Sequence, residues 1–269
     1  MRETAYAKLN LALHVRGREP DGYHRIETAF AFAEDGDGLS VAESDRVSLS
    51  IVGPFAAVLG GRDNIVLTAA HALRERFAIE AGAALTLDKR LPVASGIGGG
   101  SADAAAALRL LLRWWRIGHS ESALDGLARE LGADVPACLH SRSARGEGRG
   151  DQLEFADFGV QGAPLLMVNP GIPLATRAVF ERWSGRDGGP LGDPRLGRND
   201  LEAPARSLVP QIGEVLDAFA SLGGARLVRM SGSGATCFAL FGEEGERDEA
   251  SRRFQERHPR WWRLASRLR

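Results

Sequence analysis

The sequence has only two cysteines, Cys138 and Cys237, and they lie far apart in the chain. Neither belongs to a CxxC pair, which argues against a disulfide framework and against a structural zinc site. No apolar run approaches the roughly 18 residues that a membrane-spanning helix needs. The first residues mix Arg2, Glu3 and Lys8 with apolar side chains. We therefore expect a protein of the reducing cytoplasm, with an unprocessed N-terminus and no association with membranes.

A strong charge of either sign is also missing. The 269 residues include 34 Lys and Arg and 35 Asp and Glu, which gives a net charge of -1. This balance argues against an overall electrostatic attraction to nucleic acid or to anionic lipid. Trp261, Trp262 and the arginines near them form only a short cluster, which we interpret as packing and solvated surface. Any negatively charged ligand must therefore be held by a local arrangement of residues.

The length and composition predict an ordinary globular protein of two domains. With 44% hydrophobic residues the chain can bury a full core, and domains commonly contain roughly 100 to 200 residues. We see no internal repeat, and place the domain boundary near residue 155. The expected domains are therefore residues 1–155 and 156–269.

Periodic patterns predict helices and strands mixed along the N-terminal domain. Apolar and polar residues alternate over 47–51 and 83–88, as in half-buried strands. Between them, apolar residues recur at helical spacing from Val66 to Phe77, and Asp63 can cap this helix. A Gly-, Pro-, Asp- and Arg-rich stretch over 184–198 indicates an exposed loop. The remaining predicted elements are helices from near Ser101, from Ser120, over 210–222 and from Glu243, and strands over 165–168 and 236–241.

The most informative segment is Leu-Pro-Val-Ala-Ser-Gly-Ile-Gly-Gly-Gly-Ser-Ala-Asp-Ala-Ala, residues 91–105. A strand ends before it and a helix begins within it. Glycines let backbone N–H groups converge on one point, and a helix N-terminus adds roughly half a positive charge there. The pattern is typical of a loop that binds phosphate.

Two familiar phosphate-binding motifs do not fit this loop. A Walker motif needs Gly-Lys-Ser/Thr, whereas Gly100 is followed directly by Ser101. A dinucleotide fingerprint over Gly96, Gly98 and Ser101 has the wrong last residue. The structural alternative is a turn with a serine cap, but four glycines together with Ser101 and Asp103 favour phosphate binding.

Residues 92–105 resemble the second motif of the GHMP small-molecule kinases. Three further segments, Ala-Lys-Leu-Asn at 7–10, Asp-Gly-Tyr-His at 21–24 and Gly-Ala-Asp-Val-Pro at 132–136, are similar to the branch that acts on 4-diphosphocytidyl-2-C-methyl-D-erythritol. Met230–Phe238 resembles the third motif of the same family. These motifs stand in the order of the family and cover most of the chain.

The resemblance implies an α+β fold of two domains, the first similar to domain 2 of ribosomal protein S5 and the second ferredoxin-like. It implies a kinase that uses ATP and Mg²⁺ to phosphorylate the 2-hydroxyl of this small cytidyl diphosphate alcohol, in the non-mevalonate isoprenoid pathway. We expect a monomer or a weak homodimer. The alternatives are another GHMP kinase, of the homoserine or mevalonate type, and a non-catalytic nucleotide-binding protein of the same fold.

The resemblance assigns the catalytic roles to Lys8 and Asp134. A carboxylate beside a cation is a weak base, so Asp134 would orient the hydroxyl and accept its proton late, in a loose transition state. Lys8 would offset negative charge. Taken alone, Asp134 could also be a turn residue at a helix end before Pro136, and Lys8 a solvated lysine of a strand.

The expected contacts to the acceptor are mainly aromatic. Tyr23 can stack on a pyrimidine and His24 can hydrogen-bond its polar edge. By resemblance, Phe180 would close a sandwich around the base, although it could equally be a core residue of a helix. The residues expected to bind the acceptor are Asn10, Tyr23, His24, Thr176 and Phe180.

The expected contacts to ATP centre on the glycine-rich loop. Asn64 and Lys89 match family contacts, although a capping Asn and a Lys at a strand end are common in any protein. Ser101 could hold Mg²⁺ or cap its helix. No carboxylate cluster in the sequence predicts a metal site made by protein alone, so Mg²⁺ is expected to arrive with ATP. The loop residues expected to bind ATP are Pro92, Val93, Ala94, Ser95, Gly96, Ile97, Gly98, Gly99, Gly100, Ser101 and Ala102.

Overall fold

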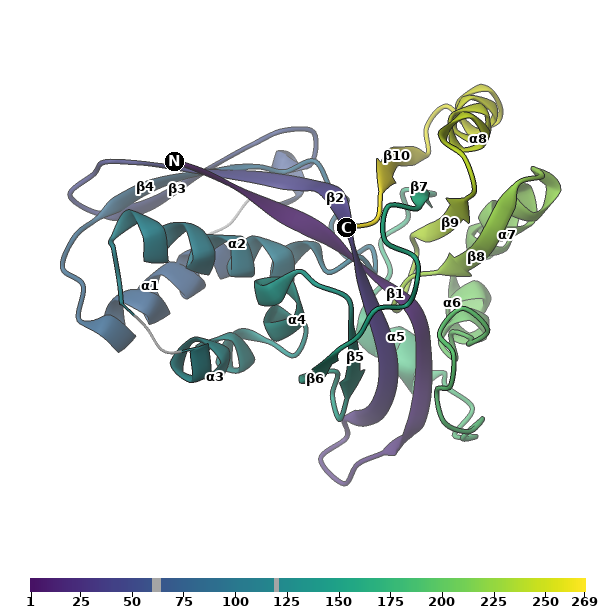
Figure 1. Ribbon diagram of the computed structural model, residues 1–269, viewed down its shortest axis with the longest axis horizontal. Helices are drawn as coiled ribbons and strands as arrows, with labels where there is room; N and C mark the ends of the chain where they lie inside the picture. Colours follow the sequence, from purple (N-terminus) through teal and green to yellow (C-terminus); the bar gives the residue numbers. More distant parts are fainter. Residues whose placement is uncertain (60–63, 119–120) are drawn as a thin grey trace. The chain divides into compact units, whose positions relative to one another are not determined.

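A computed structural model describes residues 1–59, 64–118 and 121–269 (Figure 1). Contacts divide the chain into two compact units. Unit 1 contains residues 1–7, 35–93 and 98–141, and unit 2 contains residues 8–34, 94–97 and 142–269. Two long strands, β1 (Arg2–Arg18) and β2 (His24–Ala42), contribute residues to both units. The prediction of a boundary near residue 155 assumed two continuous segments of chain, whereas each of these units combines several segments. The boundary therefore stays a prediction.

The strands of unit 1 follow the predicted alternation. β3 (Val47–Val52) pairs in parallel with β4 (Ala83–Asp88), and the C-terminal part of β2 pairs antiparallel with β4. Alternate residues of β4 are buried, because one face of the sheet meets the helices. Both predicted strands of this unit are therefore confirmed.

The helices of unit 1 are α1 (Ile65–Phe77), α2 (Gly99–Trp114), α3 (Glu121–Leu131) and α4 (Val135–His140), with a 3₁₀ turn at Ala56–Leu59. The first three were predicted. Asn64 caps α1, since its Oδ1 accepts a hydrogen bond from the amide of Val66 at 2.9 Å. The expected cap, Asp63, and the expected start of α3, Ser120, lie outside the described residues.

Helix α2 forms the buried centre of unit 1. It carries a run of small residues, Ala104 to Ala107, all fully buried, and it packs closely against α1 and α4. Arg109 of α2 donates to the carbonyl oxygens of Cys138 and Leu139 at 2.7 and 3.1 Å. These carbonyls belong to the last turn of α4, where helical partners are missing. The guanidinium thus satisfies the end of α4 together with Ser141 Oγ, which donates to the Cys138 carbonyl at 2.6 Å.

Unit 2 contains a four-stranded antiparallel sheet with the order β10-β7-β9-β8. Its elements follow one another as strand, helices, strand, strand, helix, strand. This sequence of elements and this strand order make a ferredoxin-like fold, as the resemblance implied. The strands are β7 (Pro164–Asn169), β8 (Ala225–Met230), β9 (Cys237–Phe241) and β10 (Trp262–Arg267). The helices are α5 (Thr176–Glu181), α6 (Glu202–Leu208), α7 (Gln211–Ser221) and α8 (Glu244–Arg257).

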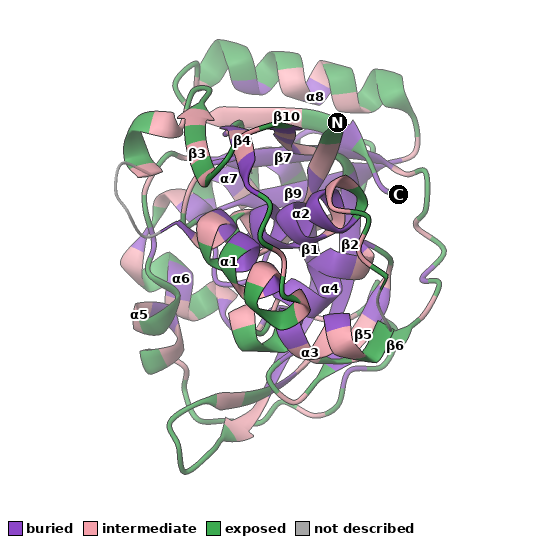
Figure 2. Ribbon diagram, turned by 90° about the vertical axis from the view of Figure 1, so that its left-hand side faces the viewer, coloured by how far each residue is buried: buried purple, intermediate pink, exposed green. Residues whose placement is uncertain are grey.

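The core of unit 2 lies between this sheet and helices α7 and α8. Every residue of β7 and β9 is buried, which explains their continuous apolar sequence, whereas most of α8 is exposed (Figure 2). Phe219 of α7 and Phe254 of α8 meet edge to face, with ring centroids 4.7 Å apart. The helices predicted over 210–222 and from Glu243 are confirmed.

The other part of unit 2 is a small antiparallel arrangement on the N-terminal half of β2. β5 (Ala144–Glu147) pairs with Thr28–Phe30 of β2, and β6 (Gln152–Phe155) pairs with β5. The segment 184–198, predicted as an exposed loop, has no helix or strand. Leu191 within it is buried, and its amide donates to Oε2 of Glu27 at 2.5 Å. This loop is therefore attached to the strand beside it.

No helix in residues 1–59, 64–118 and 121–269 has the length and apolar character needed to cross a membrane.

Candidate functional site

The glycine-rich loop ends in unit 1 at the start of α2. Gly98 is the N-cap, in the left-handed conformation with φ 64°, and as a glycine it offers no side chain to cap the helix. Ser101 is the third residue of the helix and so does not cap it. The first amides of a helix lack helical partners and carry its positive dipole end. This end of α2 therefore has the chemistry of an anion site.

Lys89 lies beneath this helix start. Its side chain is 2% exposed, and Nζ is 2.6 Å from a carboxylate oxygen of Asp37 and 2.6 Å from one of Asp103. A Cβ placed on Gly99 would lie 3.2 Å from the same Nζ. Lys89 thus anchors the loop through two ion pairs, and its predicted contact with ATP stays a prediction.

Asp37 also anchors the chain where it leaves β4. Its Oδ1 accepts hydrogen bonds from the amides of Arg90 and Leu91 at 2.6 and 2.8 Å. Burial raises the pKa of Asp103 to about 8, and the nearby Asp37 carboxylate adds to this against the opposing effect of Lys89. Sequence reasoning missed Asp37, because nothing in its neighbourhood separates it from the other acidic residues of 34–37.

The first half of the loop belongs to unit 2, where it packs against the turn Ser231–Gly234. Ser231 Oγ donates to the Gly96 carbonyl at 2.9 Å. Gly96 has φ 78°, and a Cβ there would lie 2.4 Å from the Ser231 carbonyl oxygen. Asn199 holds the turn from the other side, with Nδ2 donating to the carbonyls of Met230 and Gly232, each at 2.8 Å. The glycine-rich loop and the Ser231–Gly234 turn were both predicted to let the backbone approach a ligand closely. In unit 2 their backbones lie close to each other.

Lys8 and Asn10 form a buried pair on β1 of unit 2. Their exposed fractions are 3% and 2%, and Lys8 Nζ donates to Asn10 Oδ1 at 2.9 Å. The ammonium also lies 5.1 Å from the centroid of the Phe30 ring. The alternative interpretation of Lys8 as a solvated strand lysine is therefore wrong.

The predicted aromatic residues are also in unit 2. The His24 and Phe180 rings are 4.8 Å apart at an angle of 32°, too close for a base to lie between them. Trp183 meets His24 edge to face at 5.6 Å, and the guanidinium of Arg149 lies 3.8 Å from the centroid of the exposed Tyr23 ring. Sequence reasoning missed Trp183 and Arg149, which lie outside the motifs.

Burial lowers the pKa of His24, and the positive charge of Arg18 lowers it further. A neutral imidazole has one donor and one acceptor nitrogen. His24 therefore offers one hydrogen-bond donor and one acceptor, which point in different directions from the ring.

Thr176 and Asp134 both lie at helix starts. Thr176 is the first residue of α5, and its Oγ1 lies 2.9 Å from Ser233 Oγ, which joins it to the Ser231–Gly234 turn. Asp134, in unit 1, is the N-cap of α4 but makes no capping hydrogen bond with its side chain. Asp134 lies in the turn between the end of α3 and the start of α4, so its place in the fold agrees with the alternative of a turn residue before Pro136, and its catalytic role stays a prediction.

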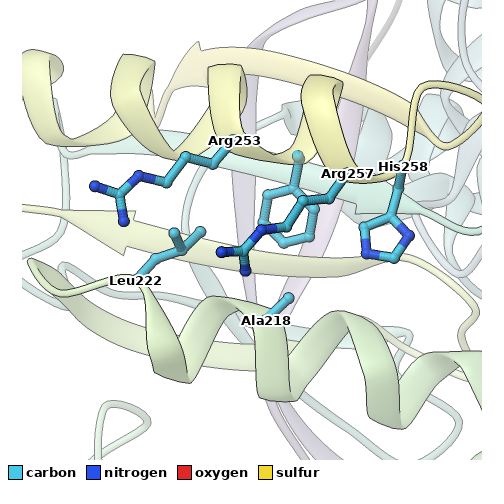
Figure 3. Close-up of a pocket in the computed structure, with 6 residues that line it drawn as sticks. Ala218, Leu222, Arg253, Arg257 and His258 are labelled. Carbon is cyan, nitrogen blue, oxygen red and sulfur yellow. The ribbon is translucent and has the colours of Figure 1, made fainter.

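A pocket in unit 2 lies outside all of these residues. It is lined by residues of α7 and α8 and the segments that follow them: Ala218, Leu222, Arg253, Phe254, Arg257 and His258 (Figure 3). Phe254 belongs to the hydrophobic core, and Arg253 pairs with Glu249. This hollow is part of the packing of α7 against α8.

Comparisons with known proteins agree with the geometry. Residues 64–142 match the GHMP kinases N terminal domain and residues 181–260 match the GHMP kinases C terminal domain. The chain is 56% identical to 4-diphosphocytidyl-2-C-methyl-D-erythritol kinase of Rhizorhabdus wittichii, over 99% of this chain and 94% of the relative. It is 48% identical to the kinase of the same name from Novosphingobium aromaticivorans, over 100% and 93%. This chain belongs to the GHMP kinases.

Solved structures place it within the GHMP kinases in the same way. The crystal structure of a 4-(cytidine 5'-diphospho)-2C-methyl-D-erythritol kinase has a TM-score of 0.85 and 33% identity, and covers 100% of this chain and 99% of that one. A homoserine kinase from Cytophaga hutchinsonii has a TM-score of 0.72 at 16% identity, over 97% and 95%, which shows the shared fold alone. The predicted family and the α+β fold of two GHMP kinase domains are confirmed.

As a GHMP kinase the chain is an ATP-dependent phosphotransferase, and the start of α2 fits a phosphate. Among the described residues, no three His, Cys, Asp or Glu side chains are grouped to hold a metal ion. The two buried carboxylates nearest the loop, Asp37 and Asp103, are bound to Lys89.

Proposed function

We propose that this GHMP kinase transfers the terminal phosphoryl group of ATP to the 2-hydroxyl of 4-diphosphocytidyl-2-C-methyl-D-erythritol, a step of the non-mevalonate isoprenoid pathway. The observation that carries the proposal is the 56% identity to a relative of that name over 99% of the chain. The buried Lys8–Asn10 pair and the aromatic residues around His24 supply matching chemistry in unit 2.

In this proposal the triphosphate of ATP lies at the start of α2. The first amides of α2, after Gly98, would bind its oxygens, and the absence of Cβ atoms on the glycines leaves the backbone accessible. Mg²⁺ would accompany ATP, keeping most of its ligands as water and phosphate oxygens. Ser101 offers one hydroxyl in the first turn. Bound Mg²⁺ would neutralise charge that develops on the phosphates.

Asp134 and Lys8 take the roles expected from the family. The carboxylate of Asp134 would orient the acceptor hydroxyl and receive its proton late in transfer, because a loose transition state needs little nucleophilicity early on. Lys8 would stabilise negative charge with a buried, oriented ammonium. Asn10 holds that ammonium through its side-chain oxygen.

The cytosine would bind against the aromatic residues of unit 2. Since His24 and Phe180 contact each other, a base stacked on the face of Phe180 that meets His24 needs a displacement of the His24 ring. The exposed Tyr23 already offers a surface. In its neutral form His24 would accept a hydrogen bond from the amino group of cytosine with its unprotonated ring nitrogen. Thr176 would contact the acceptor beside the Ser231–Gly234 turn. A cytoplasmic location and a monomer or weak homodimer stay predictions of the sequence.

A coupled assay of ADP release tests the proposed acceptor. The purified protein is given ATP and Mg²⁺ with the cytidyl alcohol, with homoserine or with mevalonate in parallel. We expect turnover only with the cytidyl alcohol. Turnover with homoserine or mevalonate alone would overturn the acceptor. Binding of ATP and the cytidyl alcohol without turnover of any of the three would indicate a non-catalytic protein.

The variant Asp134→Asn tests the proposed proton acceptor. It keeps the shape of the side chain but removes the carboxylate, so kcat should fall about 10²- to 10⁴-fold, the span for a lost acid or base. The far-ultraviolet circular dichroism and the melting temperature should stay near those of the wild type. Turnover equal to that of the wild type would remove Asp134 from the mechanism.

A further inference from the structure

The Lys8–Asn10 pair is the end of a longer chain of buried hydrogen bonds in unit 2. Asn10 Nδ2 donates to Thr28 Oγ1 at 2.8 Å, and Thr28 Oγ1 donates to the carbonyl oxygen of Ala12 at 2.7 Å. Thr28 lies on β2 and is 0% exposed. Four groups, two from side chains of β1, one from β2 and one from the backbone, are thus joined in a row away from water.

The direction of each hydrogen bond in this row is fixed by chemistry. The Ala12 carbonyl can only accept, so the single hydroxyl proton of Thr28 points to it. Thr28 Oγ1 can then only accept from Asn10, which must present its NH₂ group there. The oxygen of the Asn10 amide is consequently turned toward Lys8, whose ammonium can only donate. Reversing the amide would place NH₂ against NH₃⁺.

The rotamer of Thr28 is held by packing as well. Gly146 of β5 is its partner across the strands, and a Cβ on Gly146 would lie 3.2 Å from Thr28 Cγ2. The methyl group therefore occupies the space that the glycine leaves. Because threonine is branched at Cβ, fixing its methyl also fixes its hydroxyl.

From this row we infer that Thr28 is a positioning residue for the kinase reaction: it orients the Asn10 amide so that Oδ1 receives and aims the Lys8 ammonium. This inference rests on the proposed role of Lys8. Thr28 touches no reacting atom and acts only through Asn10. The Thr28 hydroxyl favours one of the two orientations of the Asn10 side-chain amide, and its loss removes this preference.

The test compares Thr28→Val with Thr28→Ser. Valine keeps the shape and removes the hydroxyl, and a misplaced catalytic group of this kind can cost up to about 10²-fold in rate, so we expect kcat to fall about 10- to 100-fold. The KM for ATP should change less than about 3-fold, because the proposed ATP contacts do not include Asn10. Serine restores the hydroxyl, and its kcat should stay within about 5-fold of the wild type, the loss reflecting a less restricted rotamer.

A double-mutant cycle with Asn10→Ala separates positioning from general damage to the core. If Thr28 acts through Asn10, Thr28→Val should lower kcat by less than about 3-fold in the Asn10→Ala background, since coupled residues are non-additive. Full additivity would overturn the inference, as would a folded Thr28→Val enzyme with kcat near that of the wild type. If the valine variant does not fold, Thr28→Ala takes its place in the cycle.

A measurement without turnover keeps this inference separate from the proposed function. In spectra of ¹⁵N-labelled protein, the side-chain amide of Asn10 is assigned by its absence in Asn10→Ala. Its protons should exchange slowly in the wild type and in Thr28→Ser, and at least 10-fold faster in Thr28→Val. Equal exchange in all three would overturn the orienting role of Thr28. A wild type inactive on the cytidyl alcohol would contradict the proposed function and leave this result standing.

Discussion

Each unit contains a buried lysine, and the two are held by different kinds of partner. Lys89 in unit 1 is 2% exposed and lies 2.6 Å from each of two carboxylates, those of Asp37 and Asp103. Lys8 in unit 2 is 3% exposed, and one of its hydrogen bonds, at 2.9 Å, goes to the neutral amide of Asn10. Burial alone therefore does not distinguish the roles of these two lysines.

The difference concerns what each ammonium charge does. The Asp37 carboxylate neutralises Lys89, and the Asp103 side chain, whose pKa is about 8, bonds the same ammonium. Lys89 is therefore part of the framework that fixes the glycine-rich loop. The amide oxygen of Asn10 is one partner that orients the Lys8 ammonium, and this oxygen carries no net charge. We therefore interpret Lys89 as an anchor and Lys8 as a group that acts on a ligand.

The largest expected effect is the loss of stability in Lys89→Met. Removing one partner of a buried ion pair commonly costs about 3–5 kcal/mol, because the remaining charges stay buried without compensation. We expect the free energy of unfolding to fall by that amount, measured by urea denaturation. A loss below about 1 kcal/mol would contradict the anchoring role.

Lys8→Met should show the opposite balance. Removing one electrostatic group that acts on the transition state costs about 10²- to 10³-fold in kcat. The free energy of unfolding should fall by only about 1–3 kcal/mol, the cost of leaving the Asn10 oxygen without its donor. If Lys8→Met lost more stability than Lys89→Met and less activity, the distinction between the two lysines would fail.

The variant Asp103→Asn tests how the contacts of Lys89 contribute to the pH dependence of the free energy of unfolding. The pKa of Asp103 is about 8 in the fold, against an ordinary value of 3.8. Between these values the folded protein keeps a proton that the unfolded chain has lost, so this contribution to stability declines as pH rises toward 8. The asparagine does not titrate. The stability of the variant relative to the wild type should therefore rise between pH 5 and 9, by on the order of 1 kcal/mol or more.

Asp193→Asn is the matched control for this experiment. Its hydrogen bonds with Arg195 lower the pKa of Asp193 to about 2, so it does not titrate between pH 5 and 9. Its stability relative to the wild type should be constant over that range. A slope equal to that of Asp103→Asn would assign the effect to something other than the buried carboxylate.

The smallest expected effect concerns His24. Its pKa is lowered by burial and by Arg18, so the ring stays neutral at pH 7 and becomes charged only as pH falls below its ordinary range. The imidazolium has no acceptor nitrogen, and the KM for the cytidyl alcohol should rise about 3- to 10-fold on acidification, the cost of one lost hydrogen bond. Steady-state kinetics of His24→Gln, which does not titrate, should show no such rise.

The sequence predicted those parts of the fold whose pattern is local. The alternation in β3 and β4, the period of α1 and α7 and the glycines before α2 are all visible within short windows. The strand β10 was missed, because Trp-Arg-Leu-Ala-Ser-Arg lies at a sheet edge with partly exposed residues and has no clear alternation. The short helices α5 and α6 have too few turns to show a period.

The residues of the candidate site also fall into those that a local motif predicts and those that it does not. Motifs identified Lys8, Asn10 and the loop, because those residues stand in recognisable segments. Thr28 and Asp37 were not found, since their importance comes from partners 18 and 52 residues away in the chain. A single sequence carries no sign of such pairs, which exist only once β1, β2 and β4 have come together.

Asp37 also affects when the glycine-rich loop can take shape during folding. Its carboxylate accepts hydrogen bonds from the amides of Arg90 and Leu91, which are 53 and 54 residues away in the chain. The segment that leads into the loop is therefore fixed only after distant strands have paired. Contacts of such long range form late relative to local helices. A refolding chain should therefore regain helical signal before it regains affinity for nucleotide, and ATP binding becomes a reporter of completed assembly rather than of early collapse.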